Sequence, residues 1–237
     1  EINWDIKAAE KAGYEHFMLK EIYEQPDVIN KTINALTTDK EIKLREIITK
    51  QEIKNLNEIC IVACGSAYHV GMSASYIIED LTKIPVRVEL ASEYRYRKPI
   101  LQKDSLVIII SQSGETADSL AALRETKKLG INTLGIVNVI GSSIAREADQ
   151  VIYTIAGPEI AVATTKAYST QLIVIYLLAI EMAYIRKTIT QDKYQELIKE
   201  IKTLPTKVQY VLDNEVNKIQ KIASNLFNIR DAFFIGR

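Results

Sequence analysis

The chain has 237 residues, of which 47% are hydrophobic and 25% are charged, proportions typical of a folded globular protein. Thirty Lys and Arg residues balance thirty Asp and Glu residues. The chain therefore lacks the excess of basic residues by which proteins bind nucleic acids or anionic membranes. The longest apolar run, residues 172–180, is far shorter than the about 20 residues of a membrane-spanning helix. We therefore expect neither nucleic acid nor membrane as a partner.

The two cysteines, Cys60 and Cys64, lie in one apolar run. If that run is a strand, their Cα atoms are roughly 13 Å apart, whereas a disulfide needs less than about 7 Å. Charged residues also interrupt any signal-peptide core near the start of the chain. We expect free thiols and a cytoplasmic location. No metal or cofactor is expected, because His16 and His69 are far apart and no CxxC or HExxH spacing occurs.

The N-terminal quarter of the chain predicts helices. Residues 1–13 have no partner element, and we interpret them as the tail of an upstream domain or as a linker. Residues 14–56 have apolar positions at helical spacing and predict two helices. The first should be irregular at Pro26, because proline disfavours a helical residue before it. The second should open at Thr38, since Thr38 and Glu41 resemble a capping box.

A doubly wound sheet is predicted for the middle of the chain. Short runs rich in Ile and Val are apolar on both faces, as in a parallel sheet covered by helices, and they occupy residues 59–63, 86–90, 106–110, 133–137 and 151–155. Helical stretches such as 67–81 and 116–129 lie between them. Repeated βα units of this kind predict an α/β fold with a flavodoxin-like five-stranded parallel sheet flanked by helices, spanning residues 57–190.

More helices follow the predicted sheet. We expect a long apolar helix at 165–187 and amphipathic helices at 191–203 and 206–226, which form a helical connection over 191–230. The last residues, 231–237, predict a strand with a glycine at its carboxyl end. A lone terminal strand has nothing to pair with, so we interpret it as the first strand of a second, truncated α/β unit.

Ligands of open parallel sheets bind beyond the carboxyl ends of the strands. Three such ends are small and polar: 64–67 (CGSA), 111–116 (SQSGET) and 157–165 (GPEIAVATT). In the second, Ser111, Ser113 and Thr116 offer hydroxyls, Gln112 offers an amide, and Gly114 permits a tight turn before a helix N-terminus. This pattern favours a cradle for one phosphate dianion, although a capped helix would show similar residues. Dinucleotide (GxGxxG) and P-loop motifs are absent.

For the other reactive side chains near these strand ends we predict no catalytic role. Cys64 is expected to line the pocket without acting as a nucleophile, because no histidine is positioned as its base. His69 falls inside the next helix and is interpreted as structural. Glu159 and Lys166 could exchange protons with a substrate, but we favour a helix-start carboxylate and a solvated helix cation.

Five segments together resemble one enzyme family. They are 16–26 (HFMLKEIYEQP), 63–69 (ACGSAYH), 89–97 (ELASEYRYR), 111–118 (SQSGETAD) and 156–167 (AGPEIAVATTKA). The chain resembles the isomerase part of the glutamine–fructose-6-phosphate aminotransferases, also called glucosamine-6-phosphate synthases. Their isomerase part is built from sugar isomerase (SIS) domains, a superfamily that SQSGET alone would indicate. The resemblance covers essentially the whole chain.

The resemblance implies a reaction and site residues. These enzymes use ammonia from glutamine, released in a glutaminase domain, to convert fructose 6-phosphate to glucosamine 6-phosphate for UDP-N-acetylglucosamine synthesis. Carried over, the phosphate would bind Ser111, Gln112, Ser113 and Thr116, and the sugar would contact Cys64, Gly65, Ser66, Val162, Ala163 and Thr164. Two positions depart from the family. Members of the family usually have a hydroxyl side chain where this chain has Ala67, and they often have Ser where this chain has Thr164.

The resemblance also implies what this chain lacks. The family's Schiff-base lysine, proton-transferring glutamate and ring-opening histidine belong to a second SIS domain or the C-terminal tail, beyond Arg237. We therefore expect residues 57–190 to be a first SIS domain that binds sugar phosphate, pairs as a homodimer and has no catalytic residue of its own. The alternatives are a non-catalytic phosphosugar sensor and a purely structural or dimerising domain.

Overall fold

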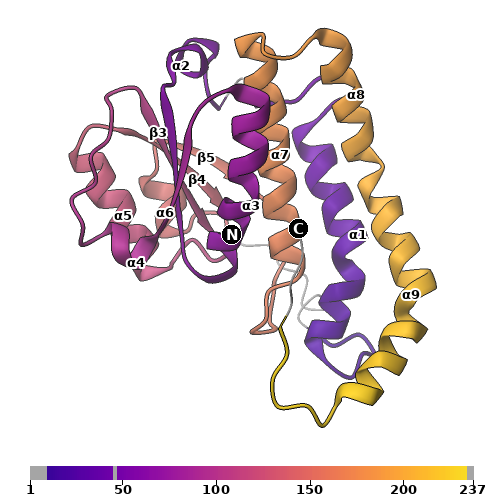
Figure 1. Cartoon of the computed structure of the whole chain (residues 1–237). Coiled ribbons are helices and arrows are strands. Elements are labelled where there is room, and N and C mark those ends of the chain that lie inside the picture. The colour runs from indigo at the N-terminus through magenta and orange to yellow at the C-terminus, as the bar shows by residue number, and fades with distance from the viewer. Residues whose placement is uncertain (1–9, 45–46, 234–237) are drawn as a thin grey trace.

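A five-stranded parallel sheet forms the centre of the molecule. A computed structural model of the chain describes residues 10–44 and 47–233 (Figure 1). The strands are β1 (Glu58–Ala63), β2 (Val86–Leu90), β3 (Ser105–Ser111), β4 (Asn132–Val137) and β5 (Gln150–Tyr153). Their order is β2-β1-β3-β4-β5 and all neighbouring pairs are parallel. The flavodoxin-like prediction is confirmed, with strand boundaries shifted by at most two residues.

Alternate residues of a strand pack into two separate hydrophobic cores, because successive side chains point to opposite faces of the sheet. In β1, Ile59 and Ile61 enter one core, whereas Cys60 and Val62 enter the other. The central strand β3 is buried over its whole length. This double burial explains why β1 and β3 read as apolar runs, whereas the edge strand β2, which contains Arg87 and Glu89, is only partly buried.

Helices cover both faces of the sheet (Figure 1). The smaller core packs beneath α4 (Ala91–Tyr94), α5 (Ala117–Lys128) and α6 (Ser143–Glu147). The larger core lies under α3 (Gly65–Thr82) and α7 (Lys166–Arg186), with α1 (Phe17–Leu36) and α8 (Gln191–Lys202) packed outside them. The remaining helices are α2 (Lys50–Asn55) and α9 (Leu204–Leu226), and α9 lies along α1.

The predicted irregularity at Pro26 is wrong, because α1 continues through it. Proline removes the N–H that would bond to the carbonyl four residues earlier, which belongs to Ile22. The Gln25 side-chain amide donates to this Ile22 carbonyl at 3.2 Å and replaces the lost bond. Pro26 itself is buried.

The predicted second helix is also misplaced. Thr38 Oγ1 does accept from the Glu41 N–H at 3.0 Å, but this bond closes a turn between Thr37 and Ile42, which form an antiparallel bridge. The capping box that starts α2 lies further along, where Thr49 and Glu52 bond reciprocally. Two Thr-x-x-Glu patterns occur within 15 residues, and local sequence does not tell a turn from a helix start.

The helix α7 is long and apolar enough to cross a membrane by length and composition. Of the 18-residue window that meets this criterion, 72% is buried inside the fold, as in the core helix of a globular domain. The segments predicted at the two chain ends lie mostly outside the described residues. Residues 1–9 and 234–237 are not described, and residues 231–233 form no strand.

Candidate functional site

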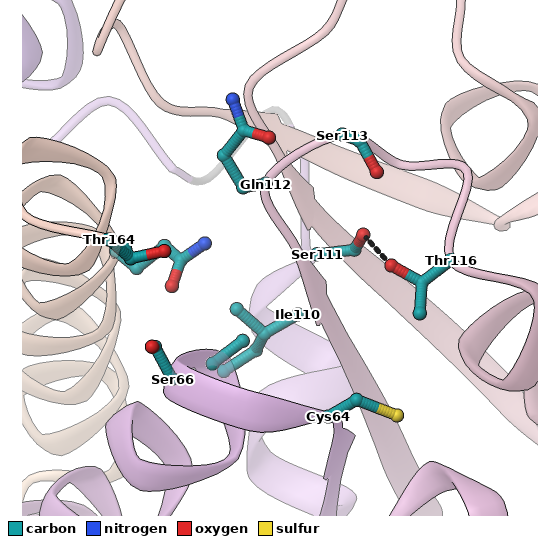
Figure 2. Close-up of a pocket in the computed structure, with 10 residues that line it drawn as sticks. Cys64, Ser66, Ile110, Ser111, Gln112, Ser113, Thr116 and Thr164 are labelled. Carbon is teal, nitrogen blue, oxygen red and sulfur yellow. Dashed lines mark hydrogen bonds between the residues drawn. The ribbon is translucent and has the colours of Figure 1, made fainter. Parts of the chain in front are cut away.

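A cavity of about 190 Å³ opens at the carboxyl edge of the sheet (Figure 2). It lies between the end of β3, the first turn of α3 and the first turns of α7. Its lining residues are Cys64, Ser66, Ala67, Ile110, Ser111, Gln112, Ser113, Thr116, Thr164 and Gln171. None of these described lining residues carries a formal charge, so the cavity offers hydroxyl and amide groups for polar recognition.

The turn after β3 is held by its own hydroxyls. Ser111 Oγ lies 2.9 Å from Thr116 Oγ1 and accepts the Gly114 N–H at 3.0 Å. Ser113 Oγ accepts the Glu115 N–H at 3.2 Å. Figure 2 shows the Ser113 hydroxyl on the same side of the turn as the Ser111–Thr116 pair. The turn therefore gathers three hydroxyls directly before α5.

Gly114 is required at this turn for two reasons. Its φ of +66° is a conformation that L-residues rarely adopt. A Cβ at this position would also lie 2.1 Å from Ser142 Oγ, which is buried at the start of α6. The backbone is fixed further by the Ile144 N–H, which donates to the Gly114 carbonyl at 3.0 Å. The tight packing holds the hydroxyls in place.

The first turn of α3 contributes the floor of the cavity. Cys64 is the N-cap of α3 and Gly65 follows with a φ of +56°. The first N–H groups of a helix have no intrahelical acceptor and carry the positive end of the helix dipole. Both α3 and α5 begin at this edge of the sheet, so two such ends border the cavity.

The thiols differ in environment. Cys64 is half-buried and lines the cavity as predicted, whereas Cys60 is fully buried and burial raises its pKa to about 12. Both are free. His69, on α3, is exposed and contacts the Tyr68 ring edge-on. This placement provides no base for Cys64.

The first turn of α7 is occupied by a carboxylate of the chain itself. Glu159 Oε1 accepts the Thr165 N–H at 2.9 Å and the Ala167 N–H at 3.2 Å, so the predicted helix-start role of Glu159 is confirmed. Burial raises the pKa of Glu159, and these two hydrogen bonds act against that shift. With α7 capped internally, the helix N-termini that remain for an anion are those of α3 and α5.

Lys166 is not the solvated cation that the sequence suggested. It is 3% exposed, and its Nζ lies 2.7 Å from Glu24 Oε2 on α1. Glu21, also on α1, accepts the N–H groups of Ile160 and Ala161 at 2.6 and 3.1 Å. The loop that carries Thr164 is therefore tied to α1 at both ends.

Most predicted ligand residues meet at one cavity. Cys64, Ser66, Ser111, Gln112, Ser113, Thr116 and Thr164 all line it. Gly65, Val162 and Ala163 do not, and Val162 is fully exposed on the loop. Sequence reasoning missed Gln171, whose signal was a single amide inside the long apolar segment that forms α7.

Metal ligation has no candidate in the described part of the chain: residues 10–44 and 47–233 hold no group of three His, Cys, Asp or Glu suited to a metal ion. The fold and the cavity thus define a doubly wound α/β domain with an uncharged, hydroxyl-rich pocket at the carboxyl edge of its sheet. The sequence profile of the SIS domain matches residues 52–181, and the chain belongs to this family.

Curated relatives match the chain along its whole length. It is 54% identical to a glutamine–fructose-6-phosphate aminotransferase (isomerizing) of Caldanaerobacter subterraneus subsp. tengcongensis and 52% identical to one of Clostridium acetobutylicum. The chain spans 39% of the length of each of these relatives. Among solved structures, the C-terminal domain of glucosamine-fructose-6-phosphate aminotransferase from Francisella tularensis matches with a TM-score of 0.88 and 41% identity. That match covers 92% of this chain and 61% of the other.

Proposed function

We propose that the chain is the first SIS domain of a glucosamine-6-phosphate synthase and binds a phosphorylated hexose. The observation that carries the proposal is the cavity that joins the hydroxyl turn at 111–116 to Cys64, Ser66 and Thr164. A whole-length similarity to aminotransferases that act on fructose 6-phosphate, by their names, supports the choice of ligand.

The chemistry of the turn suits a phosphate dianion. Ser113 and Gln112 present donors at the cavity wall, and α5 begins directly behind them. Hydrogen bonds to an ionised acceptor are stronger than neutral ones, and the positive end of a helix adds to them. Arg and Lys are not needed for such a site, as in other helix-terminus phosphate sites.

Individual roles form part of the proposal. Ser111, Gln112, Ser113 and Thr116 would hold the phosphate, whereas Cys64, Ser66 and Thr164 would contact the carbon chain. Figure 2 shows Ser66 and Thr164 on the side of the cavity opposite the turn. Gly65 would act through its backbone at the α3 terminus. Contacts from Val162 and Ala163 remain predictions from the resemblance, because neither lines the cavity.

The full reaction would need more than this chain, which spans 39% of its curated relatives. We propose that residues 57–190 bind the sugar phosphate and that 191–230 connect them to a second SIS domain that carries the catalytic groups. A glutaminase domain, a homodimer and a cytoplasmic location remain part of the same proposal. Light scattering that shows only monomers would contradict the proposed homodimer.

Calorimetry with fructose 6-phosphate and with fructose tests the proposal. The phosphorylated sugar should bind and the free sugar should bind far more weakly. Ser113→Ala should weaken fructose 6-phosphate binding by about 1.5–3 kcal/mol, since one charge-assisted hydrogen bond is lost. Ser75→Ala, on α3 but outside the cavity, is the matched control and should bind normally. Equal affinity for the two sugars would refute the phosphate site.

A further inference from the structure

One side chain in the cavity wall is almost completely buried and has a carbonyl oxygen with no hydrogen-bond partner among the described residues. Gln171, in the second turn of α7, is 2% exposed and lines the cavity. Its Oε1 is buried and accepts no hydrogen bond. A buried acceptor that is left unpaired lowers stability, because the carbonyl has lost its hydrogen bonds to water.

The neighbouring buried polar residue of α7 has hydrogen-bond partners within the helix itself. Thr170 Oγ1 is equally buried, but it donates to the carbonyls of Lys166 and Ala167, at 3.1 and 3.0 Å. Beyond Gln171, the helix continues with buried apolar residues such as Val174 and Ile175. An apolar side chain would therefore suit the position of Gln171, and the amide is not needed to build the helix.

An unpaired acceptor can form a hydrogen bond only with a part of the ligand that donates one. A phosphate dianion has acceptor oxygens only, so it gains nothing from the Gln171 carbonyl. A sugar hydroxyl can donate a hydrogen bond to it. The cavity of about 190 Å³ also exceeds the about 30 Å³ of one water several times over, so it has room for more than a phosphate group.

We propose that Gln171 is a specificity residue that accepts a hydrogen bond from a hydroxyl of the bound sugar phosphate. The inference rests on the proposed function and assigns an orientation: the phosphate lies at the turn 111–116, and the hydroxylated carbon chain runs toward α7. Gln171 then distinguishes a polyhydroxylated phosphate ester from a bare phosphate ion.

Gln171→Met tests this, because methionine keeps the length of the side chain and removes the acceptor. Calorimetry should show fructose 6-phosphate binding weakened about three- to tenfold, the range of one neutral hydrogen bond. Binding of inorganic phosphate, followed by NMR titration, should stay within twofold. The melting temperature of the ligand-free variant should rise, since an unpaired buried polar group has been replaced by an apolar one.

Thr170→Val is the matched control on the same helix. It removes a hydroxyl that the helix itself uses, so its melting temperature should fall while its affinity for fructose 6-phosphate stays the same. A fall in melting temperature for Gln171→Met would show a structural partner for the amide and overturn the inference. Unchanged fructose 6-phosphate affinity in Gln171→Met would overturn it as well, and the phosphate site would stand. Failure of the unsubstituted chain to bind fructose 6-phosphate would refute the proposed function itself, and the inference with it.

Discussion

The ammonium group of Lys166 lies 2.7 Å from the Glu24 carboxylate, although the two residues are 142 positions apart. This ion pair joins the first residue of α7 to the middle of α1. Lys166 is almost completely buried, whereas the Glu24 side chain keeps 30% of its surface exposed. The pair therefore fixes one end of the loop that brings Thr164 to the cavity. Because Lys166 is more buried than Glu24, losing Glu24 should lower the free energy of unfolding more than losing Lys166 does.

We predict that Glu24→Leu destabilises the chain more than Lys166→Met does. Glu24→Leu leaves a buried ammonium without its counter-charge and should cost up to about 3 kcal/mol, the lower end for a broken buried pair, because Glu24 is partly exposed. Lys166→Met removes the buried charge itself, and Glu24 keeps Lys20 at 3.6 Å. Urea unfolding of both variants and of the double variant measures this difference. The double variant should be more stable than Glu24→Leu alone, and equal losses in the two single variants would contradict the asymmetry.

The sheet and the turn 111–116 could be predicted from the sequence because their signals are local. Strands buried on both faces read as apolar runs, and the serines of the turn follow Ile110 directly. The environment of Lys166 could not be predicted, since its partner lies on α1 and only the folded chain brings them together. Gln171 was missed for a related reason. A polar residue in an apolar helix is recognised as part of a site only when the cavity beside it is known.

Gly114→Ala should disrupt both folding and binding. The variant combines a left-handed backbone with a methyl group 2.1 Å from Ser142 Oγ, and we expect a loss of about 2–4 kcal/mol. Gly130→Ala is the control, because Gly130 has a similar φ of +70° but open space around its Cβ position. It should lose about 1–2 kcal/mol from the backbone alone. Thermal unfolding gives both values, and equal losses would show that Ser142 simply moves aside.

Alanine variants of Ser111 and Ser113 should both bind the ligand more weakly but should differ in how much stability they lose. Ser111 is buried and bonds to both Gly114 and Thr116, so Ser111→Ala leaves a buried N–H unpaired and should cost about 1–3 kcal/mol of stability. Ser113 bonds only to the exposed Glu115 N–H, and Ser113→Ala should cost less than about 1 kcal/mol. Both should weaken fructose 6-phosphate binding in calorimetry. A stable Ser111→Ala variant with normal affinity would remove this serine from the site.

Glu159→Gln should change how stability depends on pH. Burial raises the pKa of Glu159 above its ordinary value of 4.5, and the nearby Glu21 carboxylate adds to this, whereas the Thr165 and Ala167 N–H groups oppose it. In the window above pH 4.5, the folded state then holds more protons than the unfolded state at this site, so its contribution to stability falls as pH rises.

Glutamine keeps the acceptor oxygen that caps α7 and removes the titration. The difference in unfolding free energy between Glu159→Gln and the parent chain should therefore shift in favour of the variant as pH rises from 4 to 7. Glu159→Ala is the control, because it removes both the titration and the cap, and it should be about 1 kcal/mol less stable than Glu159→Gln at every pH. Urea unfolding across this range measures all three proteins, and comparison with the parent cancels the other carboxylates, such as Glu52 and Asp149, whose pKa values are lowered. A difference that does not change with pH would mean that Glu159 ionises as it would in water, and its burial would then have no electrostatic consequence for the loop.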